Sequence, residues 1–182
     1  MDKETPTAYG FDLDQGEHID RVIHRHPLAF LPSLLASVVL FLLALFFLYI
    51  GARSPLGFPF PPLLIMAIAS IMIVLSIIIF FVGLFVFRRN VLVFTIEHLV
   101  QVEQFGLFTH RVSQINFTRV QDVTGQKSGV TQTLFNYGSV EIQSAGEQEK
   151  FIFSYAPDPQ DIADDVLQIH EKCLARGPQP QE

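Results

Sequence analysis

Charged residues are missing from two long stretches of this 182-residue sequence. No Asp, Glu, Lys or Arg occurs in residues 27–52 or in residues 54–87, and only Arg53 separates the two stretches. Soluble domains carry charge throughout, at about a quarter of their residues, so this absence excludes a wholly soluble chain. Outside these stretches the composition is ordinary for a protein in water. We therefore expect a chain that is part membrane protein and part small soluble domain.

Two apolar segments form the cores of predicted transmembrane helices, at residues 28–50 and 63–87. At about 1.5 Å per residue, each helix would exceed the roughly 30 Å hydrocarbon core of a bilayer. Four prolines in residues 51–62 prevent a helix from continuing through that connection. The sequence therefore predicts a two-helix membrane hairpin within residues 21–89, and the length of the first apolar run argues against a cleaved signal peptide.

Basic residues beside the predicted helices favour one orientation. Four arginines flank the outer ends of the hairpin: Arg21, Arg25, Arg88 and Arg89. Arg53 alone lies in the connection. Because basic residues concentrate on the cytoplasmic side, we expect a multi-pass protein of the plasma (inner) membrane with both termini in the cytoplasm. The lone Cys173 fits that compartment, since a single cysteine forms no internal disulfide.

Both ends of the chain are predicted to be flexible tails. Residues 1–20 carry six acidic residues against Lys3 alone and few large apolar side chains. A docking peptide that uses Tyr9 and Phe11 is the alternative interpretation of this segment. Residues 177–182 follow the Gly-Pro pair that should end the last helix.

From residue 90 to residue 156 the pattern changes to short apolar runs broken by turn residues. This pattern is typical of an antiparallel all-β unit. Val140 and Ile142 alternate with polar residues and are expected to face inward. Six or seven strands fit, and the clearest lie at residues 91–96, 99–105, 107–112, 115–123, 139–144 and 150–155, with a turn at Ala145-Gly146 before the last of them.

A helix is expected at the end of this unit, from Pro159 to Arg176. Asp158 is suited to cap it, and proline is favoured at the first helical position. Its apolar stripe consists of Ile162, Val166, Ile169 and Cys173, widened by Leu167 and Leu174. Such a stripe must be buried, so the helix should cover the open end of a small β-barrel, with Cys173 as a core position.

An ordered series of short motifs follows the two apolar segments: Thr95-Ile-Glu-His-Leu99, Phe105-Gly-Leu107, Arg119-Val-Gln-Asp-Val123, Tyr137-Gly-Ser-Val-Glu-Ile142, Ser144-Ala-Gly146 and Pro157-Asp-Pro159. In this order, the chain from residue 20 to residue 175 resembles the bacterial pleckstrin-homology-like (PH-like) membrane proteins. The resemblance implies a mainly-β, PH-like barrel of about seven strands with a C-terminal helix, over residues 90–176. It also implies a family without established catalytic activity that is mostly assumed to scaffold other proteins. The chain has His98 where the family often has a basic residue.

No motif for catalysis, for a cofactor or for a metal is present. No glycine-rich phosphate loop opens a helix, and no Ser or Cys nucleophile stands in a recognisable context. His24 and His26 are two residues apart, but no carboxylate or cysteine set at ligand spacing accompanies them. We therefore expect no enzyme, no cofactor and no metal site.

The function expected from these features is a protein-interaction or oligomerisation scaffold at the cytoplasmic membrane face. Its partners would be the lipid bilayer, another membrane or cytoplasmic protein, and further copies of the chain. Residues 88–182 carry eight Lys and Arg against twelve Asp and Glu, a net charge of 8 − 12 = −4, so nucleic acid is not an expected partner. Five small residues are candidates for the contact between the helices, with simple filler as the alternative interpretation: Ser33, Ser37, Ser70, Ser76 and Gly83.

The alternative function is recognition of anionic lipid headgroups. Three basic residues form the candidate anionic-ligand patch: Arg111, Arg119 and Lys127. By the resemblance, a headgroup loop at the first strand–strand connection would fall at Glu97-His98.

Overall fold

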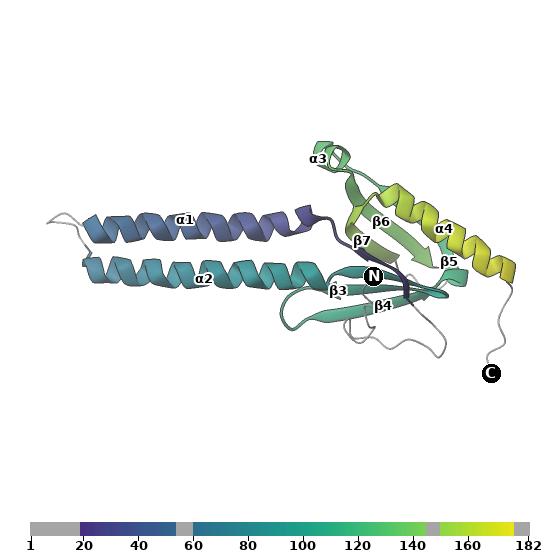
Figure 1. The fold of residues 1–182 in the computed structure, drawn as a ribbon, viewed down its shortest axis with the longest axis horizontal. Helices are drawn as coiled ribbons and strands as arrows, with labels where there is room; N and C mark the ends of the chain where they lie inside the picture. Colours follow the sequence, from purple (N-terminus) through teal and green to yellow (C-terminus); the bar gives the residue numbers. More distant parts are fainter. Residues whose placement is uncertain (1–18, 54–59, 145–149, 177–182) are drawn as a thin grey trace. The chain divides into compact units, whose positions relative to one another are not determined.

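The computed structural model describes residues 19–53, 60–144 and 150–176. These residues divide into two compact units (Figure 1). Residues 27–87 form a helical hairpin, and residues up to His26 together with those from Arg88 onward form a β unit. The chain thus leaves the β unit, makes the hairpin and returns to it.

Several predicted features lie outside the described residues. They are the acidic segment before residue 19 with Tyr9 and Phe11, residues 54–59 of the connection, the Ala145-Gly146 turn, and the tail after residue 176.

The hairpin unit consists of two long apolar helices. A 3₁₀ turn, η2 (Pro27–Phe30), leads into α1 (Leu31–Arg53), and α2 spans Pro62–Arg89. Both helices are long and apolar enough to cross a membrane. Two long apolar helices are confirmed at the predicted places, with the first helix continuing three residues past Ile50.

Small residues line the contact between the two helices. Buried small residues recur every seven positions, at Ser37, Ala44 and Gly51 on α1 and at Ala69 and Ser76 on α2. A seven-residue repeat keeps one face of a helix turned toward its partner, and small side chains let the backbones approach. Ser76 Oγ donates to the carbonyl oxygen of Ser37 across the contact at 2.8 Å.

Four of the five candidate small residues take part in this contact. Ser37 and Ser76 are buried there, and a Cβ on Gly83 would lie 2.5 Å from Ser33. Ser70 does not, because its hydroxyl is exposed and donates to the Met66 carbonyl oxygen of its own helix.

The β unit contains seven strands in two antiparallel sheets, ordered β1-β2-β3-β4 and β5-β6-β7. The first sheet comprises β1 (Ile19–His24), β2 (Val91–Thr95), β3 (His98–Gln104) and β4 (His110–Asn116). The second comprises β5 (Val120–Gln126), β6 (Tyr137–Ser144) and β7 (Lys150–Pro157). Three helical segments complete the unit: η3 (Phe117–Arg119), α3 (Val130–Leu134) and α4 (Pro159–Arg176). This architecture confirms the PH-like fold.

Strand β1 was not predicted, and it changes the boundary of the β unit. Its residues pair with β2 from Ile19 opposite Thr95 to His24 opposite Val91. The hairpin is therefore inserted between two neighbouring strands of one sheet, and residues 21–26 belong to the β unit rather than to the hairpin. The sequence gives little signal for β1, because it is a short, charged edge strand directly before a long apolar segment.

The boundaries of β4 and β5 also differ from those predicted. A strand was expected at residues 107–112, but Leu107 and Phe108 lie in an exposed turn in which Phe105 N donates to Thr109 O at 3.0 Å. Strand β4 consequently begins at His110, and η3 separates it from β5. Helix α3 was likewise not predicted.

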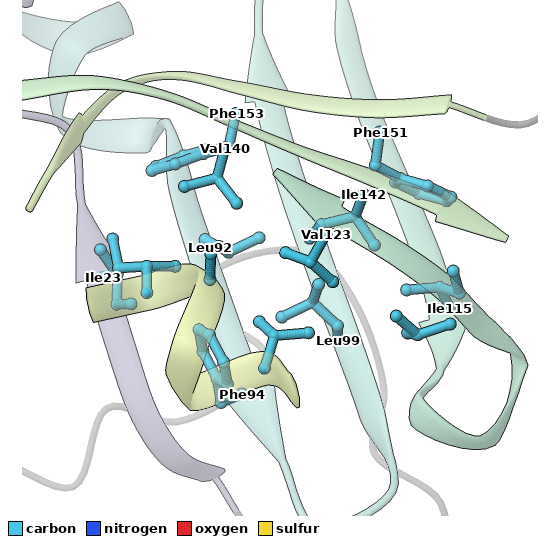
Figure 2. Packing of buried hydrophobic residues seen from close by; sticks show 14 of the residues in the cluster. Ile23, Leu92, Phe94, Leu99, Ile115, Val123, Val140, Ile142, Phe151 and Phe153 are labelled. Carbon is cyan, nitrogen blue, oxygen red and sulfur yellow. The ribbon is translucent and has the colours of Figure 1, made fainter. Parts of the chain in front are cut away.

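The core of the β unit lies between the two sheets and α4. Figure 2 shows side chains of the first sheet, such as Leu92 and Phe94, meeting those of the second, such as Val140 and Phe153. Helix α4 adds Ile162, Ala163 and Val166. A second apolar cluster, on the opposite face of the first sheet, contains Val91, Val93, Val100 and Val102.

Helix α4 closes the side of the β unit that lies between β1 and β5. Asp165 forms an ion pair with Arg21 of β1, and a Cβ on Gly125 of β5 would overlap the Pro159 backbone. The predicted stripe is confirmed at Ile162 and Val166, and Ile169 and Cys173 pack against the core while partly buried. Leu167 and Leu174 are exposed, so the stripe is narrower than predicted.

Replacement of Ile162 by alanine should destabilise the β unit by about 2–4 kcal/mol, because it leaves a cavity under α4. The matched change Leu174→Ala on the exposed face should cost less than about 0.5 kcal/mol. Urea unfolding of the full-length protein in detergent, followed by tyrosine fluorescence, measures both. Equal losses would contradict the position of α4.

Candidate interaction surface

A groove of about 290 Å³ lies between the first sheet and β7. Its lining residues are Gln101, Glu103, Arg111, Ser113, Lys150, Phe151 and Ile152. Gln101 Nε2 donates to the Ile152 carbonyl oxygen at 3.0 Å and so joins the two sheets at the groove. The groove therefore lies where the sheets part, between their outer strands β4 and β7.

The groove is polar because the inward face of β3 changes character along its length. Leu99 belongs to the core, whereas Gln101 and Glu103, two and four residues on, line the groove. Strand β4 mirrors this change, since Ile115, Ser113 and Arg111 lie opposite these three residues in the register. The inward-facing residues of β3 and β4 thus change together from apolar to polar toward one end of the sheet.

Arg25 supports the polar end of the interior. Its Nη2 lies 3.4 Å from Glu103 Oε1, and its guanidinium carbon lies 5.6 Å from the centre of the Phe153 ring. Burial lowers the pKa of Arg25 below its ordinary value, and the nearby Glu103 carboxylate opposes this effect. Its Nε is buried without a hydrogen-bond partner among the described residues. The arginine expected as a membrane flank is thus a structural residue of the β unit.

A stack of three rings fixes the segment that precedes the hairpin. The His26 ring stacks on Tyr137 with 5.1 Å between centroids, and Tyr137 stacks on Tyr155 with 5.6 Å. The backbone amide of His26 also donates to the Tyr155 carbonyl oxygen at 2.7 Å. Across residues 19–53, 60–144 and 150–176, no three His, Cys, Asp or Glu side chains gather as a metal site requires.

The three residues of the predicted anionic-ligand patch are not brought together. Arg111 is near the start of β4 and Arg119 follows its end, so about 17 Å of strand separates them. Strand β5 in turn separates Arg119 from Lys127 by about 23 Å. Lys127 donates to Asn136 Oδ1. Only Arg111 of these three lines the groove.

The Glu97-His98 connection, where a headgroup was expected to bind, is not the first strand–strand connection of the β unit. Glu97-His98 joins β2 to β3, because the unpredicted β1 shifts the count of strands by one. The connection between the first and second strands is the hairpin itself.

Most charged groups of the groove are already paired. Lys150 forms an ion pair with Glu141, and its hydrogen bond lowers the pKa of that carboxyl below its ordinary value. Glu103 faces Arg25. Arg111 has no ion-pair partner in the described part of the chain, so its guanidinium is available to a ligand. The sequence alone indicated Arg111 but not Gln101, Glu103 or Lys150. The signal of Gln101 and Glu103 is their polar character opposite polar residues of the adjacent strand, which depends on the strand pairing.

A family model described as bacterial PH domain matches residues 27–169. The match begins with the hairpin and ends within α4, so it includes β2 to β7 but not β1. No curated protein and no solved structure matches the chain at a significant level.

Replacement of Arg25 by methionine should destabilise the β unit by about 2–4 kcal/mol, because it leaves Glu103 partly buried without its partner. The control is Arg21→Met on the same strand, expected to cost less than about 1 kcal/mol. The two ion pairs differ in side-chain exposure, which is 19% and 20% for Arg25–Glu103 but 58% and 39% for Arg21–Asp165. Urea unfolding in detergent compares the variants. A smaller loss for Arg25→Met than for Arg21→Met would contradict the assignment.

Proposed function

The chain belongs to the bacterial PH domain family, and we propose that it is a non-enzymatic scaffold that holds a protein-interaction surface at the cytoplasmic face of the plasma membrane. The hairpin is the anchor in this proposal, and the β unit binds the partner. The partner is another protein or a second copy of this chain, which contributes an extended segment.

The pairing of β1 with β2 supports the membrane topology of this proposal. These strands flank the hairpin in the sequence and are hydrogen-bonded neighbours in one sheet. A sheet cannot have neighbouring strands on opposite sides of a bilayer, so both ends of the hairpin must open on the same side. The excess of arginines at these ends over the single Arg53 favours the cytoplasm for that side.

The outer edge of β4 is the observation that carries the proposal. Strand β4 is the last strand of its sheet, and within the described residues no further strand pairs with it. An open edge presents unpaired backbone groups that can accept an added strand. The groove beside this edge offers Arg111 and Ser113 to the side chains of such a segment.

The pairing within the groove supports binding rather than catalysis. Gln101 is engaged with the Ile152 carbonyl, Lys150 with Glu141, and Glu103 with Arg25. Groups held in this way position the groove walls. An activated nucleophile beside a general base would be needed for acyl or phosphoryl transfer.

Site-specific photocrosslinking in native membranes tests the scaffold. A photoreactive phenylalanine analogue replaces Gln114, which is exposed on β4, and in a matched control it replaces Gln168, which is exposed on α4. We expect a reproducible protein adduct from position 114 that is at least about tenfold stronger than from position 168, since interfaces are local patches. Mass spectrometry identifies the adduct.

Two outcomes of this experiment would refute the scaffold. One is the absence of any protein adduct at position 114 above that at position 168. The other is an adduct consisting of lipid alone, which would favour recognition of lipid headgroups.

Substitution of Arg111 and Arg119 by glutamate distinguishes the scaffold function from the alternative function, which is recognition of anionic lipid headgroups. Because the two arginines lie at opposite ends of β4, we expect no loss of anionic lipid around the protein. Quantification of lipids retained in nanodiscs excised from native membranes measures this, with Lys172→Glu on α4 as the control for added negative charge. Selective loss of anionic lipid from the double variant would support recognition of lipid headgroups and would contradict the scaffold as the primary function.

A further inference from the structure

Two exposed apolar tips project from the β unit. In the turn between β3 and β4, Phe108 is 95% exposed, and Phe105 and Leu107 are also exposed. In α3, Val130 is 82% and Leu134 73% exposed. Apolar side chains clustered on a surface in this way mark a contact with another apolar body.

The first tip lies at the end of the β unit where the chain returns from the hairpin. Val91, at the start of β2, pairs with Val102 near the end of β3. Asn90 stands directly after α2, and its Nδ2 donates to the Gln104 carbonyl oxygen at 3.0 Å. The Gln104 amide donates back to Asn90 Oδ1 at 3.1 Å. The residue that follows the membrane helix thus holds the base of the Phe105–Thr109 turn.

The second tip is linked through Tyr137 to His26, which directly precedes the hairpin. His26 stacks on Tyr137, and the Tyr137 hydroxyl lies 3.4 Å from Thr131 Oγ1 in α3. The two exits of the chain are themselves adjacent, because His24 pairs with Val91. Both tips therefore belong to the end of the β unit from which the chain enters and leaves the hairpin.

We propose that the Phe105–Thr109 turn and α3 insert their apolar side chains into the interfacial layer of the bilayer that holds the hairpin. The chain must reach the membrane within a few residues of His26 and Asn90, which brings this end of the β unit to the lipid. Val130 and Leu134 are four residues apart and share one face of α3. Interfacial segments place Phe and Leu at this depth.

This contact differs from recognition of headgroups. It depends on apolar side chains and needs no basic cluster, which agrees with the net charge of 8 − 12 = −4 over residues 88–182. Insertion at two points, beside the two chain exits, would hold the β unit at a fixed tilt against the membrane. The β4 edge would then be presented in one orientation.

Tryptophan fluorescence in reconstituted vesicles tests the insertion. The natural sequence has no tryptophan, so Phe108→Trp and Leu134→Trp each provide a single reporter in the full-length protein. The vesicles consist of phosphatidylcholine with or without brominated acyl chains. Ile71→Trp, exposed on α2, is the quenched control, and Leu174→Trp, exposed on α4, is the unquenched control.

We expect blue-shifted emission from the Phe108→Trp and Leu134→Trp variants and a loss of about half of their intensity in brominated lipid, between the two controls. The loss should be the same when anionic lipid is added to the vesicles. Quenching no greater than that of Leu174→Trp would overturn the proposal. Blue-shifted emission without quenching would also overturn it, because protein would then cover the tips. Crosslinking at position 114 does not depend on these results, so the scaffold and the insertion can fail separately.

Discussion

The hydrogen bonding of β1 to β2 is the interaction on which the rest of the structure depends. It joins residues 19–24 to residues 91–95 across the whole hairpin. Because the chain must return to the strand it left, the two helices must run antiparallel, and their small-residue contact makes that return possible. The same pairing brings the two ends of the hairpin together, since His24 lies opposite Val91, and the nearby His26 and Asn90 support the two apolar tips.

The interior of the β unit is apolar on the side that α4 covers and polar on the side that opens into the groove. Where α4 closes the unit, Ile162 and Val166 complete an apolar core. Toward the groove, Gln101 and Glu103 replace apolar residues on the inward face of β3, and Arg25 and the Ile152 carbonyl compensate them. Buried polar groups cost free energy unless they are paired, so the pairing makes a polar opening compatible with a small core.

The sequence predicted those elements whose residues carry a local signal of their own, either an apolar run or a period. The two candidate membrane helices were indicated by long apolar runs without charge, and β2 by a short apolar run. Strands β3, β6 and β7 and helix α4 were indicated by apolar residues that recur at a spacing of 2 or 3.6. Strand β1 was missed because its stability comes from β2, far along the chain. Leu107 and Phe108 match the pattern of a strand start although they are exposed, since periodicity alone does not distinguish a buried apolar residue from one at a projecting turn.

Composition and local pattern thus determined that this chain has two membrane-spanning candidates followed by an antiparallel β unit with a capping helix, and the ordered series of short motifs added the resemblance to a PH-like fold. Only the tertiary structure decided that the hairpin is an insertion within a sheet and that Arg111 lies in a groove with Gln101 and Lys150. It also separated Arg111 from Arg119 and Lys127, although all three are basic residues of one small domain. The physical reason is that periodicity arises between near neighbours in the sequence, whereas a site arises from strand pairing between residues that are far apart.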